Sequence, residues 1–173
     1  MIETSPARPV SPVRRETALA AGAQGAIAAA GLAAALATVD GPARALILWV
    51  VTGAVVGAAQ AARAGWLAGE PAPRPAPGAR SERAGDTVRR TVVVLAPAVV
   101  LQAVALLVGA GLGAIVAGVL TGTALGEMRA RALAGRRETA DGGELVRELG
   151  PHPFAGPRRP LYTRPRSDST LAT

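Results

Sequence analysis

The sequence predicts an all-α membrane protein with four transmembrane helices, arranged as two antiparallel hairpins with both termini in the cytoplasm. Three observations support this fold class. Of the 173 residues, 50% are hydrophobic but only 2% are aromatic, whereas soluble domains of this length bury more large rings. Three long stretches contain no charged residue. The arginines cluster in the segments before, between and after these stretches.

The uncharged stretches lie between Glu16 and Asp40, between Arg44 and Arg63, and between Arg90 and Glu127. A helix crosses the hydrocarbon layer with about 20 apolar residues, so each of the first two stretches forms one span. The third would reach roughly 54 Å as one helix, and its glycine cluster at 109–113 favours a tight turn. We therefore expect transmembrane helices at 17–39, 44–66, 90–108 and 112–131.

The remaining segments complete five predicted regions. A cytoplasmic segment at 1–16 precedes the first hairpin, 17–66, and a Pro-rich linker at 67–89 joins it to the second hairpin, 90–131. The last region, 132–173, is predicted to be a basic and largely disordered cytoplasmic tail, because it is rich in Pro and Arg. Within this region we expect the fourth helix to continue to Glu138, and Asp141 to cap a short helix through Leu149.

Arginine placement predicts the orientation. All 19 basic residues are arginine, a usage typical of a GC-rich bacterial genome, and the net charge is +7. With both termini inside, the outer turns hold only Arg44. This bias follows the positive-inside rule and indicates a multi-pass protein of the bacterial inner membrane. Trp49 and Trp66, about 25 Å apart on one helix, fit the two interfacial aromatic belts.

The apolar segments allow two other interpretations. The first, Ala-rich span follows Arg14 and Arg15 as a secretory signal would, but its apolar run exceeds the usual 7–15 residues and no clear cleavage site ends it. A soluble helical bundle is disfavoured, because a soluble helix needs a polar face and the third stretch offers none. Whether the first span is retained or cleaved stays open.

Small residues recur at every fourth position on two of the predicted helices. On the fourth helix Gly118, Gly122 and Gly126 share one face, and on the second helix Gly53 and Gly57 do the same. Such faces let two backbones approach closely in lipid. We interpret them as packing surfaces within one bundle, with an oligomer interface as the alternative.

Three glutamines are the candidate polar residues inside the spans. Gln24 and Gln60 lie at similar depth on neighbouring helices and are expected to hydrogen-bond to each other. Gln102 follows Pro97, which is expected to kink the third helix. Packing is the simpler role for Pro97 and Gln102, and a substrate or pore site is the alternative.

The chemistry that the sequence lacks narrows the function. There is no cysteine and one histidine, His152, so disulfides, thiol catalysis and a His or Cys metal site are not expected. No span contains Asp, Glu or His, and no hydrolase, zincin or nucleotide-binding motif is present. We therefore predict no catalytic, cofactor-binding or metal-binding residue and no enzymatic activity.

The sequence supports two hypotheses of function. The first is an accessory or assembly protein that packs through Gly/Ala helix faces. The second is a small transporter or channel subunit acting as a homo-oligomer, suggested by Pro97, Gln102 and a weak recurrence of Val-Arg-Arg before each hairpin. Expected partners are the lipid bilayer, anionic lipids at the Arg-rich tail, and a second copy or another membrane protein. Nucleic acid is not expected, because no basic segment carries interleaved aromatics.

Overall fold

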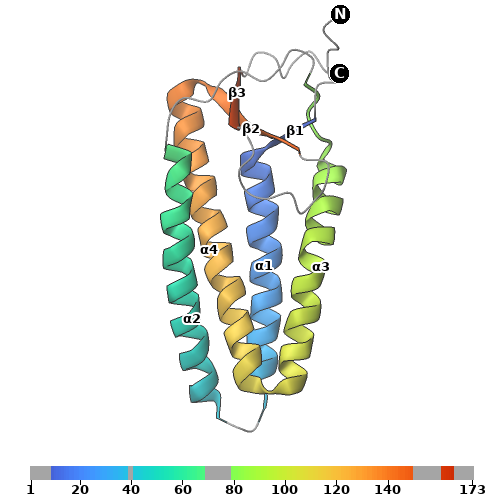
Figure 1. The fold of residues 1–173 in the computed structure, drawn as a ribbon, viewed down its shortest axis with the longest axis vertical. Coiled ribbons are helices and arrows are strands. Elements are labelled where there is room, and N and C mark those ends of the chain that lie inside the picture. Colours follow the sequence, from blue (N-terminus) through green and yellow to red (C-terminus); the bar gives the residue numbers. More distant parts are fainter. Residues whose placement is uncertain (1–8, 39–40, 69–78, 150–160, 166–173) are drawn as a thin grey trace, which may run out of the picture.

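The computed structural model describes residues 9–38, 41–68, 79–149 and 161–165. Four long helices dominate it (Figure 1): α1 Val13–Leu36, α2 Pro42–Arg63, α3 Ala84–Val108 and α4 Ala110–Asp141. A 3-10 turn, Ala64–Ala68, follows α2. All four helices are long and apolar enough to cross a membrane, which confirms the predicted number of spans and the membrane class.

Local sequence explains where the helices begin and end. Pro42 occupies the first turn of α2, where its missing N–H is not needed, and Gly41 before it has a φ of 106° that favours glycine. Gly109 alone links α3 to α4, so the predicted glycine turn is confirmed in its tightest form. Gly142 ends α4 with a φ of 66°, the left-handed conformation common after a helix.

Helix α4 is the centre of the bundle. It lies between α1 and α2 along most of their length, whereas α1 and α2 touch each other little although they are consecutive in the chain. Helix α3 packs beside α1 and the first part of α4 (Figure 1). The main packing partners are therefore helices that are distant in sequence.

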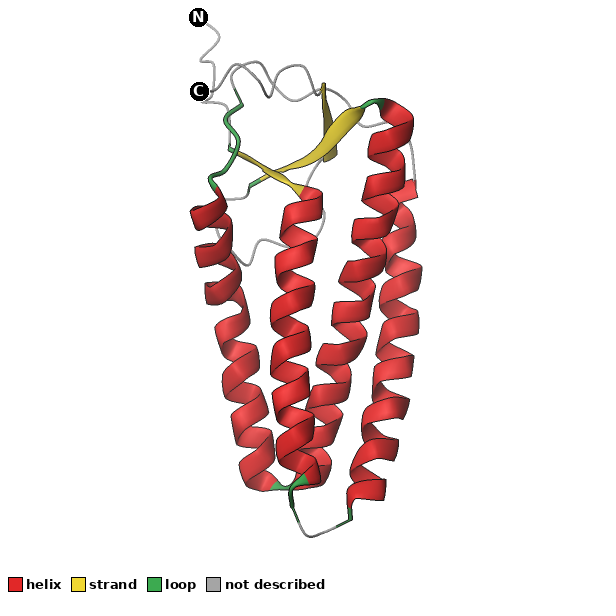
Figure 2. Ribbon diagram, turned by 180° about the vertical axis from the view of Figure 1, so that it is seen from behind, coloured by secondary structure: helices red, strands yellow, loops and turns green. Residues whose placement is uncertain are grey.

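A small antiparallel sheet covers one end of the bundle (Figure 2). Its strands are β1 Val10–Pro12, β2 Gly143–Glu148 and β3 Leu161–Pro165, in the order β1-β2-β3. Val10 also forms a single bridge to Ser81, just before α3. The sheet thus joins the segment before α1, the segment before α3 and the chain after α4.

The sheet corrects two predictions. The fold is not purely α, and Gly143–Glu148 form a strand instead of the short helix expected through Leu149. The expected disorder of the region 132–173 does not hold for its described residues, because α4 continues to Asp141 and both β2 and β3 follow. Residues 150–160 and 166–173 of that region, and residues 69–78 of the Pro-rich linker, lie outside the described residues.

Burial in the bundle is the reverse of that in a soluble protein. Most of the buried positions within the helices are Ala and Gly, whereas large Val and Leu side chains point outward, with Leu107 88% exposed. Outward apolar side chains are expected where lipid is the solvent. A separate apolar cluster of Val13, Ala134 and Leu145 attaches the sheet to α1 and α4.

Candidate functional site

The predicted glycine faces of α2 and α4 lie against each other. A Cβ added at Gly118 would lie 2.8 Å from the carbonyl oxygen of Trp49, and one at Gly122 would lie 2.7 Å from the backbone nitrogen of Gly57. At Gly53 the nearest atom would be 3.4 Å away, at the carbonyl oxygen of Gly118. The two backbones are therefore as close as glycine allows, and these residues are used for packing inside the bundle.

Gln60 completes the α2–α4 interface at the sheet end. A Cβ at Gly126 would collide with the Cβ of Gln60, so the aliphatic part of Gln60 fills the space that the missing side chain leaves. Nearer the start of α2, the Nε1 of Trp49 donates a hydrogen bond of 2.9 Å to the Oγ1 of Thr121. Trp49 therefore faces α4, and Trp66 lies in the 3-10 turn beyond α2, so the expected pair of Trp residues on one helix is wrong.

Gln102 connects three helices. Its side chain is 5% exposed, its Nε2 donates to the carbonyl oxygen of Gly113 at 3.1 Å, and its amide presses on Gly31 of α1. Its Oε1 is buried without a hydrogen-bond partner among the described residues. Gln24 also keeps a buried Oε1 without such a partner, so this oxygen does not form the predicted hydrogen bond to Gln60.

Charged side chains gather where the sheet meets the helices. Arg90 of α3 pairs with both Glu16 of α1 and Glu82, and its Nη2 lies 3.1 Å from the Oε2 of Glu82. Glu16 also faces Arg147 of β2, with 3.5 Å between the Nε and Oε2 atoms. These ion pairs join α1, α3, β2 and the segment before α3, and we call these four residues the charged cluster.

Glu82 is held in its ionised form. Burial by itself raises the pKa of Glu82, but hydrogen bonds from Arg90 and Thr87, together with the charge of Arg90, outweigh it and keep the pKa below its usual value. The Oγ1 of Thr87 donates to Glu82 at 2.8 Å. The backbone carbonyl of Glu82 also accepts from Arg15 of α1 at 2.8 Å, so both parts of this residue attach α3 to α1.

A second set of interactions holds β2 onto α4. Glu138 is 4% exposed, and its Oε1 accepts a hydrogen bond of 3.1 Å from the backbone N–H of Leu145. Its Oε2 lies 3.4 Å from the Nη1 of Arg14. One buried carboxylate thus satisfies a strand donor and an arginine, which positions the sheet over the bundle.

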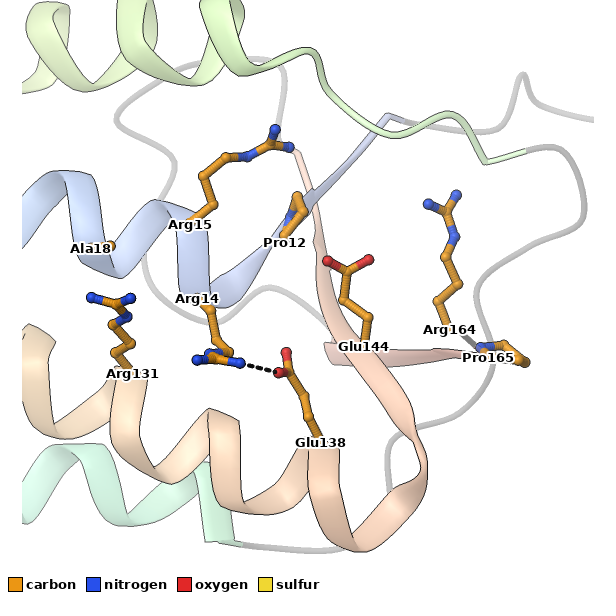
Figure 3. Close-up of a pocket in the computed structure, with 9 residues that line it drawn as sticks. All are labelled: Pro12, Arg14, Arg15, Ala18, Arg131, Glu138, Glu144, Arg164 and Pro165. Carbon is orange, nitrogen blue, oxygen red and sulfur yellow. Dashed lines mark hydrogen bonds and ion pairs between the residues drawn. The ribbon is translucent and has the colours of Figure 1, made fainter. Parts of the chain in front are cut away.

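Beside Glu138 lies a cavity of about 590 Å³ between α1, α4 and the sheet (Figure 3). Arg14 from α1 and Arg131 from α4 lie between the two helices, and Arg164 of β3 lies on the far side of Glu144 from them. The cavity is lined by four arginines and two carboxylates: Arg14, Arg15, Arg131, Arg164, Glu138 and Glu144. Its wall is therefore positive by two charges.

Arginine placement in the sequence predicted that the arginines of the cavity and of the charged cluster lie on one side of the membrane. It did not predict which of them lie close together. The pairs of the cluster join residues far apart in the chain, such as Glu16 with Arg90 and Glu16 with Arg147. A local signal for the strands was present, because Gly142-Gly143 precede Glu144-Leu145-Val146 and because Leu161-Tyr162-Thr163 favour β structure. Their pairing with Val10–Pro12 has no local signal.

The described residues contain no group of three His, Cys, Asp or Glu side chains able to hold a metal ion. Comparison with protein-family models, curated proteins and solved structures finds no match to this chain.

Proposed function

We propose that this is a small integral protein of the bacterial inner membrane that acts as an accessory or assembly protein. The bundle serves as the anchor, and the sheet with its surrounding charges is the surface offered to a partner. One contrast carries this proposal. The small residues of α2 and α4 are used in internal packing, whereas the charged side chains concentrate at the sheet end.

The proposed orientation places the sheet end in the cytoplasm. Both α1 and α3 begin at this end, and α4 finishes there. Arginines near it include Arg14, Arg90 and Arg147, whereas Arg44 lies at the opposite end, where α2 begins. The positive-inside rule favours cytoplasmic placement of the arginine-rich end. In this orientation the helices form two membrane hairpins with cytoplasmic termini.

The experiment is site-specific photocrosslinking in the native host. A benzophenone amino acid replaces Tyr162 of β3 in a tagged chain expressed at its native level, and the matched control carries it at Arg44. We expect one stoichiometric adduct from the Tyr162 position and none of that mass from Arg44. Recovery of the chain without a protein adduct at either site would overturn the accessory function.

A transport function is the second candidate, and two cavities that enter the bundle favour it. Two cavities of about 300 and 220 Å³ enter the bundle from the sheet end, and both are lined by Thr17, Glu127 and Arg147. Gln60 lines the first and Gln24 the second. Amide and carboxylate groups at this depth are typical of solute paths.

Liposome flux separates the two functions. If the protein transports a solute, proteoliposomes loaded with a panel of small ions should show flux that Gln24→Leu abolishes and Gln102→Ala leaves in place, because Gln24 lines one of these two cavities and Gln102 lines neither. If the protein is an accessory factor, the purified chain shows no flux and neither substitution changes that result.

A further inference from the structure

We propose that the arginine-lined cavity and an apolar groove below it form one binding site for an anionic phospholipid. The phosphodiester occupies the cavity and an acyl chain occupies the groove. The site requires only that the sheet end lies at a headgroup layer, which either orientation of the bundle supplies. Its success or failure is therefore independent of the proposed accessory function.

The cavity matches the charge of a phosphodiester. The carboxylate of Glu138 already forms an ion pair with Arg14 and accepts a hydrogen bond from the N–H of Leu145. Arg131 is exposed and makes no hydrogen bond or ion pair with any residue the structure describes. Arg164 uses one Nη2 donor on the carbonyl of Ala79 at 2.9 Å, which leaves other guanidinium N–H groups for a ligand. Arginine is suited to phosphate because its planar fork can donate two parallel hydrogen bonds.

The apolar groove has a volume of about 320 Å³ and is lined by α1, α2 and α4, where α1 and α2 make few contacts with each other. Its walls are formed by small and apolar residues: Gly25, Ala28, Ala29, Leu32, Trp49, Thr121, Ala124 and Leu125. The two polar side chains among them, Trp49 and Thr121, hydrogen-bond to each other. The groove therefore presents no unpaired side-chain polar group to a hydrocarbon chain.

Helix periodicity places the cavity and the groove on one continuous face. On α1, Ala18 lines the cavity and Gly25 lines the groove; on α4, Arg131 lines the cavity and Ala124 the groove. Each pair is seven residues apart, which is two helical turns on the same side and about 10 Å along the axis. A single lipid can therefore lie along both helices, with its headgroup in the arginine-lined cavity and its acyl chain in the apolar groove.

The test measures lipid retained by the full-length protein from nanodiscs of equimolar phosphatidylglycerol and phosphatidylcholine, by native mass spectrometry after mild detergent release. We expect phosphatidylglycerol to be retained about tenfold more than phosphatidylcholine. Arg131→Gln should lower that preference about fivefold, the effect of one arginine at an anionic headgroup, and Arg131→Lys should keep most of it. Arg136→Gln, an exposed arginine on α4 outside the cavity, is the matched control and should change nothing.

The groove is tested separately. Ala29→Leu fills it and should reduce retention of both lipids, whereas Ala30→Leu, on another face of the same helix, should not. Glycerol 3-phosphate carries a phosphate monoester on glycerol without an acyl chain and should fail to displace bound lipid. Equal retention of the two lipids by the unaltered protein, an unchanged preference in Arg131→Gln, or displacement by glycerol 3-phosphate would each overturn the proposed lipid site.

Discussion

The α2–α4 interface and the charged cluster at the sheet end hold the same bundle together by opposite means. At the interface, Gly53 and Gly57 meet Gly118 and Gly122 with no side chain between the backbones. In the cluster, Arg90 bridges two carboxylates from different segments. The first region is stabilised by close packing, and the second by paired charge.

The difference follows from the solvent that each region faces. Lipid gives two apolar helices no hydrophobic reason to associate, so close backbone contact supplies the attraction. Outside the apolar stretches charges are tolerated, and pairing partly offsets the cost of taking them from water. Replacing a residue by another of the wrong size should therefore damage the interface most, and removing a charge should damage the cluster most.

The largest expected effect is at Gly122. Gly122→Leu places a side chain where even a Cβ would lie 2.8 Å from the carbonyl oxygen of Gly53, so α2 must move away from α4. We expect a loss of about 3 kcal/mol in the free energy of unfolding, at the upper end for overpacking, measured by denaturation in mixed micelles. Gly22→Leu is the matched control, because nothing lies within 4 Å of a Cβ there. An equal loss in both variants would contradict the close-packing explanation.

The next effect is at Glu16, the centre of the charged cluster. Glu16→Gln removes the charge that faces both Arg90 and Arg147. We expect a loss of about 1–2 kcal/mol, between the values for exposed pairs and for fully buried ones, in the same denaturation assay. Asp141→Asn, in the i,i+4 pair with Arg137, should cost less than about 0.5 kcal/mol. A larger effect at Asp141 than at Glu16 would show that the cluster does not hold the sheet end.

Substitutions of Gln102 test whether close packing or hydrogen bonding stabilises the interior of the bundle. Gln102→Ala loses the hydrogen bond to Gly113 and leaves a space beside Gly31, so we expect a loss of about 1 kcal/mol. Gln102→Met keeps the volume and removes the unpartnered Oε1, so it should be nearly neutral in thermal unfolding. If Gln102→Met is as damaging as Gln102→Ala, the polar contact matters more than the packing.

The smallest expected effect is the pH dependence at Glu82. Its pKa is below the usual value of 4.5 in the folded protein, so its contribution is fully present above about pH 4.5. That contribution is lost as the pH falls through the lowered pKa, because the unfolded chain binds the proton more readily. We expect a decrease below about 1 kcal/mol between pH 5 and pH 3. Glu82→Gln should show a smaller decrease over this range, and an unchanged profile would contradict the assignment.

Much of the bundle was predictable from local pattern. The absence of charge between Arg90 and Glu127, interrupted by the glycine cluster, correctly predicted two helices with a tight turn at Gly109. Helix ends differ by a few residues because charged side chains such as Arg14 and Arg15 continue the helical turn beyond the apolar stretch. Glycine spacing predicted packing faces on the second and fourth helices, but it did not predict that these two faces contact each other.

The sequence by itself determined four apolar helices, because uncharged length and glycine position act locally and dictate what crosses a membrane. Only the tertiary structure decided that α4 is central, that a sheet covers one end, and that Glu16, Arg90 and Arg147 meet there. The physical reason is distance along the chain. Val10–Pro12 pair with Gly143–Glu148 because the bundle holds both segments at one end, and no local sequence pattern predicts that pairing.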